Sequence, residues 1–214
     1  MYIFIKNVKY CVTFYFLRRH QYKKRNKSRT GLNTLDDSAL MLKVKAGDLD
    51  RMSLLFERHN RKLFAFLFHL SHKREASEDM VQNVFYRMLK YRHTFTEESN
   101  FSGWMYQIAR NVLKDQVKKY EIANRYEPIE AVEERIEGGT TADERLEKKQ
   151  ARAELFEAMR KLSDDNREIL TMSRFQEMKH SEIGSILGIN EGTVRVRIYR
   201  AMQELKNIYT RIER

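Results

Sequence analysis

Cysteine, proline and long apolar runs are almost absent from this chain, and each absence excludes a class of protein. Cys11 is the single cysteine among 214 residues, so an internal disulfide and a cysteine-based zinc site are both excluded, and such sparing use of cysteine fits a reducing cytoplasm. One proline and eight glycines leave long stretches free to form helix. The composition therefore predicts a soluble, helical, cytoplasmic protein.

Charge is abundant but unevenly distributed along the chain. The 41 basic residues outnumber the 30 acidic ones, and residues 1–30 contain nine of the basic residues and none of the acidic ones. Subtracting those nine from 41 leaves 32 basic residues, which nearly balance the 30 acidic ones. The basic character belongs mainly to the first thirty residues, so it does not indicate that the remainder binds nucleic acid.

Residues 1–34 form a basic extension whose apolar stretches are interrupted. Lys6 and Lys9 break the first of these stretches, whereas a membrane-spanning helix needs about 20 apolar residues. A signal peptide places its basic residues before the apolar ones, which is not the order here. Three interpretations stay open: an anchor at a membrane surface, a nonspecific DNA-binding arm, and a disordered extension translated from a start assigned too early. We favour the last.

Apolar residues at helical spacing predict a bundle of helices over residues 35–120. The first helix follows Asp36 or Asp37 and is expected to end at Ala46-Gly47, where glycine favours a stop. Further helices are expected at about residues 49–70, 76–91 and 100–120, with a polar loop at residues 92–99. No strand pattern competes, so we predict an all-α N-terminal domain.

The chain changes in character after residue 120. Residues 121–148 are rich in acidic residues and contain the only proline and the pair Gly138-Gly139, which predicts a flexible acidic linker. Helical spacing returns in residues 149–214, where one helix is expected before Ser163 and another is expected to be capped by it. We therefore predict two helical domains joined by a linker.

The most informative stretch runs from His180 to Ile208. A short helix at about residues 180–187 is expected to end at Gly188, and Asn190 is a good N-cap for the next helix. Apolar residues four and three positions apart give that second helix one apolar face, and basic residues occupy the opposite side. Two short helices joined by a glycine turn predict a helix-turn-helix whose second helix is the recognition helix.

A recognition helix of this composition can read DNA directly. Arginines near its N-terminal end can donate two hydrogen bonds to guanine in the major groove, and Thr193 with the free amides near Glu191 and Gly192 suits a phosphate. The alternative is an ordinary helical hairpin with a solvated charged face. Gly184, where close packing in such a motif favours a small residue, shifts the balance toward DNA.

No residues form a recognisable catalytic or metal-binding pattern, so we expect neither enzymatic activity nor a cofactor or metal. His69 and His72 are three residues apart, but no pair of carboxylates completes a site, and we interpret both as surface or packing residues. Glu78-Asp79 is better explained as negative charge at a helix N-terminus than as a general acid.

A second candidate nucleic-acid surface follows the polar loop at residues 92–99. Its residues are Asn100, Phe101, Trp104, Gln107, Arg110, Asn111 and Lys114. Rings beside amides and basic residues are typical of proteins that bind single-stranded nucleic acid, because bases stack on the rings and phosphates contact the charges. Rings at helical spacing also pack in cores, so a purely structural role for Phe101 and Trp104 stays open.

Three spaced motifs, at residues 78–85, 101–111 and 187–201, together carry a family resemblance. They read EDMVQNVF, FSGWMYQIARN and LGINEGTVRVRIYRA. In this order they resemble the EDLVQEVF, FxxWLYxIARN and LGISxGTVKSRxxRA patterns of the extracytoplasmic-function (ECF) sigma factors of bacterial RNA polymerase, which belong to the sigma-70 family. The resemblance extends from about Asp36 to Ile208. It implies a two-domain promoter-specificity factor that catalyses no reaction itself.

The resemblance also implies partners and site residues. Core RNA polymerase would be bound by Glu78, Asp79, Gln82, Asn83 and Phe85. The −10 element of the promoter would be opened and held as single strand by Asn100, Phe101, Trp104, Gln107, Arg110, Asn111 and Lys114. The −35 element would be read as duplex by Thr193, Arg195, Val196, Arg197, Tyr199 and Arg200. An anti-sigma factor is the expected inhibitor, and a membrane would be involved only indirectly through it.

Some residues depart from the family pattern, and two rival functions stay open. Asn83 stands where the family usually has Glu, Ser163 where it usually has Pro, and residues 1–34 have no counterpart. One rival is a stand-alone helix-turn-helix regulator, which would bind a palindrome as a dimer. The other is a membrane-anchored adaptor that uses residues 1–30. A single helix-turn-helix, no dimerisation heptads and a second DNA surface favour the sigma factor.

Overall fold

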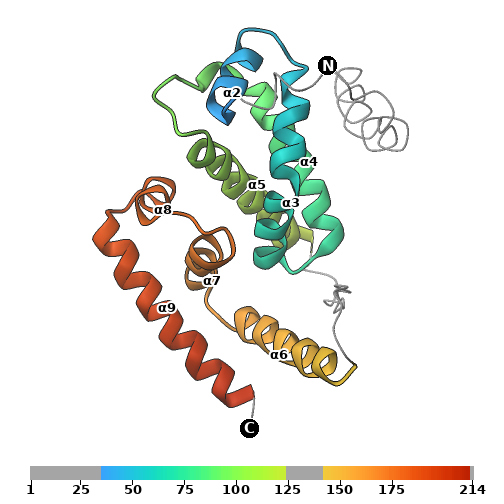
Figure 1. Ribbon diagram of the computed structural model, residues 1–214, viewed down its shortest axis with the longest axis vertical. Coiled ribbons are helices and arrows are strands. Elements are labelled where there is room, and N and C mark those ends of the chain that lie inside the picture. Colours follow the sequence, from blue (N-terminus) through green and yellow to red (C-terminus); the bar gives the residue numbers. More distant parts are fainter. Residues whose placement is uncertain (1–34, 124–141, 213–214) are drawn as a thin grey trace. The chain divides into compact units, whose positions relative to one another are not determined.

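The computed structural model describes residues 35–123 and 142–212, and every regular element within those two ranges is a helix (Figure 1). The elements are, in order, α2 (Asp37–Lys45), α3 (Arg51–Ser71), α4 (Arg74–Lys90), the 3₁₀ turn η2 (Arg92–Thr94), α5 (Phe101–Ala123), α6 (Ala142–Arg160), α7 (Asp164–Leu170), the π-helical turn η3 (Thr171–Phe175), α8 (His180–Leu187) and α9 (Glu191–Ile212). The predicted all-α class is confirmed.

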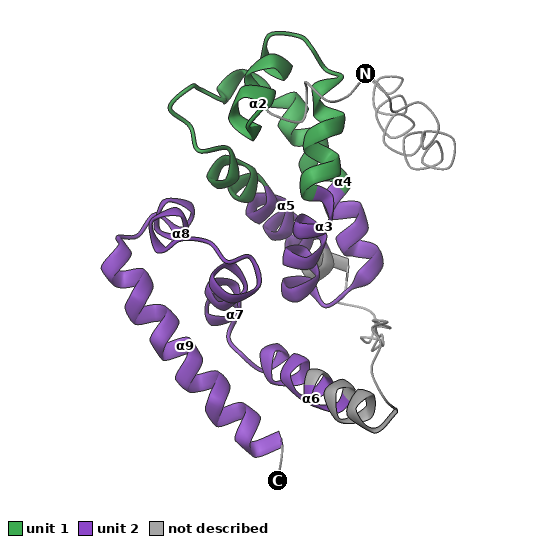
Figure 2. Cartoon of the chain, viewed as in Figure 1, with its two compact units in different colours: residues 1–59, 82–108 green, residues 60–81, 109–214 purple. Residues whose placement is uncertain are grey.

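The chain divides into two compact units, which Figure 2 shows in different colours. The first unit comprises residues 1–59 and 82–108, and the second comprises residues 60–81 and 109–214. The division passes through α3, α4 and α5, so the units differ from the predicted sequence domains 35–120 and 149–214. Those domain boundaries stay a prediction.

In the first unit, capping and side-chain hydrogen bonds fix α2 against its neighbours. The carboxylate of Asp36 accepts from the Ala39 amide at 2.6 Å and begins α2, as predicted. The Asp37 carboxylate accepts from Arg58 and His59 on α3, at 2.7 Å in each case. Leu40, Met41 and Val44 of α2 are fully buried. α2 is therefore attached to α3 by both packing and charge.

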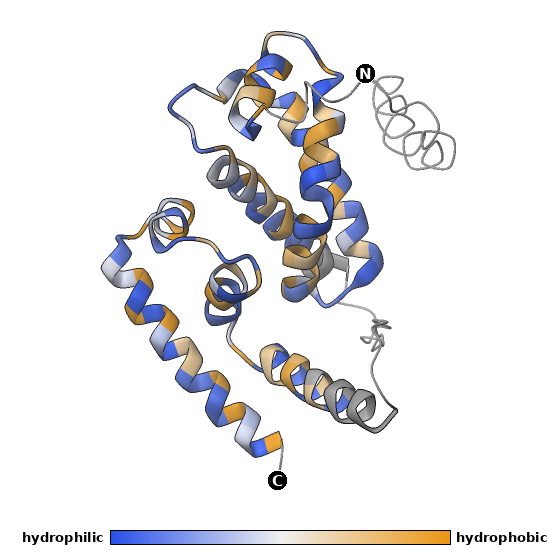
Figure 3. Cartoon of the chain, viewed as in Figure 1, coloured by the Kyte–Doolittle hydropathy of each residue, from blue (hydrophilic) through white to orange (hydrophobic). Residues whose placement is uncertain are grey.

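In the second unit, α6, α7 and α8 pack against α9. The face of α9 predicted to be apolar is buried at Val194, Ile198 and Ala201, and hydrophobic patches recur along α9 among hydrophilic residues (Figure 3). Burying three such side chains contributes several kcal/mol, at roughly 25 cal/mol per Å² of apolar surface. This packing fixes which side of α9 faces solvent.

Two local expectations differ from the structure, and the end of α7 adds a feature that the sequence did not predict. Residues 121–123 and 142–148, predicted as linker, belong to α5 and α6. In the second segment, A-D-E-R-L-E-K consists mainly of strong helix formers. Ser163 occupies the N-cap position of α7, but its side chain makes no capping hydrogen bond. α7 passes into a π-helical turn at Thr171, where Met172 is fully buried. Residues 124–141 of the predicted linker and residues 1–34 lie outside the described residues.

Candidate functional site

The helix-turn-helix formed by α8 and α9 is built by local signals that the sequence displays. Gly188 adopts the left-handed conformation, with φ at 69°, and ends α8. The side-chain oxygen of Asn190 then accepts from the Thr193 amide at 2.8 Å and caps α9. The Glu182 carboxylate accepts from the Lys179 amide at 3.0 Å and fixes the start of α8. The predicted turn geometry is confirmed.

Gly184 permits the close approach of α8 to this turn. A Cβ atom added at Gly184 would lie 2.6 Å from the carbonyl oxygen of Ile189, a distance that side-chain carbons do not reach in real structures. The Gly184 carbonyl also accepts from the Ile189 amide at 3.0 Å. Only glycine fits here without displacing the turn, which confirms the requirement for a small residue.

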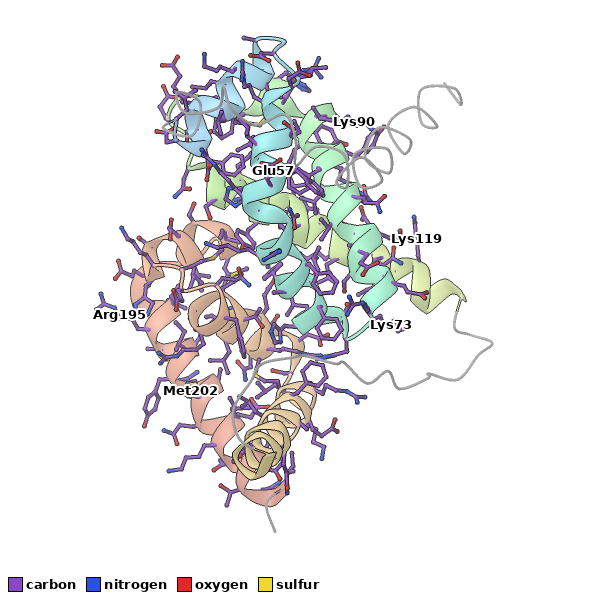
Figure 4. All side chains as sticks on the ribbon, turned by 45° about the vertical axis from the view of Figure 1, so that its right-hand side comes forward. Glu57, Lys73, Lys90, Lys119, Arg195 and Met202 are labelled. Carbon is purple, nitrogen blue, oxygen red and sulfur yellow. The ribbon has the colours of Figure 1, made fainter. Side chains whose placement is uncertain are left out.

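The solvent-facing side of α9 carries five of the six residues predicted to read the −35 element. Tyr199 is 66% exposed and Val196 is 48% exposed. Arg195, Arg197 and Arg200 are also exposed, and Arg195 projects from the edge of α9 in Figure 4. The sixth residue, Thr193, is half-buried, and its hydroxyl donates to Asn190 at 3.0 Å. α9 therefore presents a basic and aromatic face to solvent.

The residues predicted to hold the −10 element fall into exposed and buried groups. Asn100, Gln107, Asn111 and Lys114 are exposed. Phe101 is only 3% exposed, and its ring centroid lies 5.1 Å from that of His59 and 6.3 Å from that of Phe95. In this structure the Phe101 ring packs in the core, which is the structural alternative that its helical spacing left open.

Trp104 lies between these two groups and is held against the loop that precedes α5. Its ring centroid is 5.2 Å from that of Phe95, and its indole nitrogen donates to the Thr94 hydroxyl at 3.3 Å. The half-buried ring is therefore fixed in orientation. A fixed, partly open ring can stack on a base without a further loss of rotamer entropy.

Phe95 was missed by the sequence analysis, which treated residues 92–99 as entirely polar and outside the core. Phe95 is fully buried, and its carbonyl accepts from the Lys45 ammonium at 2.6 Å. The hydroxyls of Thr96 and Ser99 are 2.9 Å apart and close the turn that follows. The loop is thus anchored at its centre. A lone aromatic residue in a polar loop is the signal that could have identified this anchor.

Arg110, also predicted to bind DNA from α5, makes hydrogen bonds to parts of the chain that are distant in sequence. Its guanidinium donates to both carboxylate oxygens of Glu168, at 2.7 and 3.1 Å, and to the Ile186 carbonyl oxygen at 2.9 Å. The Arg110 and Glu168 side chains are 20% and 17% exposed. No local pattern predicts this contact, because Glu168 lies 58 residues away along the chain.

The residues predicted to bind core polymerase lie on α4 and differ in exposure. Glu78 and Asp79 are exposed, and Gln82 and Asn83 are half-buried. Asn83, which replaces the usual Glu, accepts from Arg87 at 3.2 Å. Phe85 is 2% exposed, and its ring centroid lies 4.8 Å from that of Phe56. The structure therefore gives Phe85 a packing role and leaves the two acids facing solvent.

His69 and His72 lie among aromatic rings rather than in a metal site. Their ring centroids lie 4.2 Å from that of Phe175 and 5.1 Å from that of Phe156, respectively. Burial, followed by the nearby Arg167 cation, lowers the pKa of His72 to about 4. A guanidinium nitrogen of Arg167 lies 2.8 Å from Nε2 of His72, which accepts as neutral imidazole. No metal-binding group of three His, Cys, Asp or Glu residues occurs in the described part of the chain.

Two family models match this chain, and both describe regions of the same family. "Sigma-70 region 2" matches residues 55–121 and "Sigma-70, region 4" matches residues 152–205. The chain belongs to the sigma-70 family, in its ECF group. The region 2 match contains α4 and most of α3 and α5. The region 4 match contains α8 and most of α9.

Relatives extend this similarity over most of the chain. The ECF sigma factor BldN of Streptomyces coelicolor is 25% identical over 80% of this chain and 67% of its own length. CarQ of Myxococcus xanthus is 25% identical over 81% of this chain and 97% of its own length. The ECF sigma-E factor of Escherichia coli K12 is 27% identical over 81% of this chain and 94% of its own length.

Solved structures show the same fold. CnrH, in complex with the cytosolic domain of CnrY, superposes with a TM-score of 0.59 and 22% identity over 80% of this chain and 96% of that one. RpoE of Bartonella quintana, in complex with the anti-sigma factor NepR, superposes with a TM-score of 0.61 and 23% identity over 74% of this chain and 96% of that one.

Within residues 35–123 and 142–212, no helix is long and apolar enough to cross a membrane.

Proposed function

We propose that this sigma factor binds core RNA polymerase and directs it to two-part promoters, reading duplex −35 DNA with α9 and opening the −10 element with the start of α5. The exposed basic and aromatic face of α9, in a chain that contains both sigma-70 regions, carries this proposal. Arg195 and Arg200 supply bidentate donors for guanine. Arg197, at the edge of this face, supplies a phosphate contact.

The downstream element is assigned to the exposed amides and lysine of α5 together with Trp104. Asn100 and Trp104 follow the anchored loop at residues 92–99, and an extruded base meets an amide and a ring there. Gln107, Asn111 and Lys114 continue along the helix toward the phosphates of the strand. The buried Phe101 ring packs on His59 and so supports this surface from the core.

Partners and location follow from the same assignment. The exposed acids Glu78 and Asp79, with Gln82 and Asn83, dock α4 on core polymerase. Both superposed sigma factors were solved in complex with another protein, CnrY or the anti-sigma factor NepR, and an anti-sigma factor is the proposed inhibitor here. The protein acts in the cytoplasm and catalyses no reaction itself.

Run-off transcription with purified core polymerase on genomic fragments tests this function. We expect discrete transcripts that require the protein, and Arg200→Ala should remove them selectively from promoters with a guanine at the contacted position. The rival function, a stand-alone regulator, predicts tight, sequence-specific binding to duplex DNA without core polymerase. Transcription that is independent of the added protein would contradict the proposal.

A further inference from the structure

Arg110 is more tightly held than any arginine of the α9 face. All three guanidinium nitrogens donate: Nε and Nη2 to the Glu168 carboxylate on α7, and Nη1 to the Ile186 carbonyl at the end of α8. A bidentate guanidinium–carboxylate pair is both stronger and more directional than a single ionic contact. The helix C-terminus adds partial negative charge beside the cation.

The neighbours of Arg110 on α5 do not share this arrangement. Asn111, the next residue, and Lys114, one turn later, are exposed. Arg110 itself lies inside the second compact unit, where α5 from residue 109 onward belongs with α7 and α8. One residue of the proposed downstream-DNA surface is therefore occupied by the protein itself, while the residues beside it remain open to solvent.

The acceptors on Arg110 resemble a phosphate of the −10 strand, to which the family resemblance assigns this residue. The two oxygens of a carboxylate and two oxygens of a phosphate fit the same guanidinium fork. Glu168 occupies the fork formed by Nε and Nη2 of Arg110, and the Ile186 carbonyl takes a third of its five N–H donors. A phosphate can bind bidentately to that fork only if it displaces the Glu168 carboxylate. At this fork, the Glu168 carboxylate and a phosphate therefore exclude each other.

We propose that Glu168 acts as an internal substitute for a DNA phosphate, so that the free protein holds Arg110 in an autoinhibitory contact. This proposal rests on the proposed function of α5. Binding of the downstream strand must displace Glu168 and release the end of α8. The energy of the internal contact therefore lowers the apparent affinity for promoter DNA, as any competition between two bound states does.

The first test measures the contact in the free, full-length protein. Urea unfolding of wild type, Arg110→Gln, Glu168→Gln and the double variant forms a double-mutant cycle. Hydrogen bonds between charged groups that are partly shielded from water predict a coupling of about five- to tenfold in the unfolding constant. Additive effects of the two substitutions would overturn the contact and the proposal with it.

The second test measures competition in open-complex formation with core polymerase on a promoter identified by run-off transcription. Glu168→Gln is expected to lower the half-saturating protein concentration about fivefold. The matched control is Glu157→Gln, which removes an ion pair with Arg160 on α6 and should change nothing. In an Arg110→Gln background, Glu168→Gln should also change nothing, because Glu168 acts only through Arg110.

Two results would contradict the proposal while leaving the sigma-factor function intact. One is an unchanged half-saturating concentration for Glu168→Gln. The other is an equal improvement with and without Arg110, which would show that Glu168 repels DNA by its charge alone. Failure of the wild-type protein to support any transcription would instead overturn the proposed function, and the inference falls with it.

Discussion

The two proposed DNA surfaces hold their arginines in opposite ways. On α9, Arg195 makes one ion pair, to Glu191 at 2.5 Å, and both side chains are largely exposed. On α5, Arg110 makes a half-buried bidentate pair and a third hydrogen bond. Exposed pairs are worth little because water and salt screen them. In the proposed account, the arginines of α9 are ready to bind DNA in the free protein, whereas Arg110 on the downstream surface must first be released.

The largest expected effect concerns the turn that orients α9. Gly184→Ala places a Cβ atom against the Ile189 carbonyl oxygen, so we expect a loss of about 2–3 kcal/mol in the free energy of unfolding. Urea denaturation measures this loss. Gly103→Ala is the matched control, because the nearest atom lies 3.9 Å from its added Cβ. Alanine is favoured over glycine inside a helix, so this substitution should raise the free energy of unfolding by about 0.5–1 kcal/mol. Equal effects of the two substitutions would mean that the close approach at Gly184 is unimportant.

The next effect compares the two arginines directly through stability. Arg110→Gln leaves the Glu168 carboxylate half-buried without its cation, and we expect a loss of about 2 kcal/mol after allowance for its partial exposure. Arg195→Gln removes only an exposed pair and should cost less than about 0.5 kcal/mol. Thermal and urea unfolding of the two variants at the same pH provide the comparison. Similar losses would remove the distinction between the two surfaces.

In promoter reading, unlike in stability, the exposed arginines of α9 should matter most. Arg195→Ala or Arg200→Ala removes a bidentate base contact and should weaken the preference at one promoter position by about 1–3 kcal/mol. Arg197→Ala should instead weaken all sequences alike and reduce the salt dependence of binding. Competition between promoter variants in the presence of core polymerase measures both. If all three variants keep the wild-type preference, the recognition face is assigned to the wrong side of α9.

The smallest expected effect is a pH dependence at His72. Its pKa is about 4 in the folded protein, because burial and then Arg167 disfavour the cation, whereas an unfolded imidazole titrates near 6.5. Between these two pKa values, His72 binds a proton in the unfolded chain but not in the folded one. The free energy of unfolding therefore falls as the pH drops from about 6.5 toward 4. His72 contributes less than about 1 kcal/mol to the loss of unfolding free energy between pH 6.5 and pH 5, once solvent screening is allowed for.

His72→Asn isolates this contribution. Asparagine tolerates the left-handed backbone at this position, where φ is 54°, and its oxygen can still accept from Arg167 without titrating. Unfolding free energies at pH 6.5 and pH 5 should differ less in the variant than in the wild type. Parallel pH profiles would show that His72 does not hold its neutral form in solution.

Sequence reasoning succeeded where the determinant and its effect lie within a few residues of each other. Gly188, Asn190 and Gly184 each act on a turn inside the same short motif, so their roles could be predicted from spacing. The Arg167–His72 contact joins residues 95 positions apart. The Arg110–Glu168 contact joins residues 58 positions apart and depends on how α5 packs against α7. Neither leaves a periodic signal in the sequence.

The aromatic residues show a second limit. Helical spacing gives Phe85, Phe101 and Trp104 the same pattern whether a ring packs inside or projects outward, and only the packed structure separates them. Phe85 and Phe101 are buried, while Trp104 is half-buried and fixed by Thr94. Phe95 was missed because one buried ring in a polar loop has no periodicity to detect.

The central claim is that α9 and α5 act together on a promoter only when core polymerase positions them. Footprinting and permanganate probing of one promoter, with the protein alone, core alone and both, test it most directly. The account predicts protection of the −35 element and reactive thymines at the −10 element only when both are present. Sequence-specific protection at nanomolar concentrations of the isolated protein would contradict it, and the chain would then act as a stand-alone regulator.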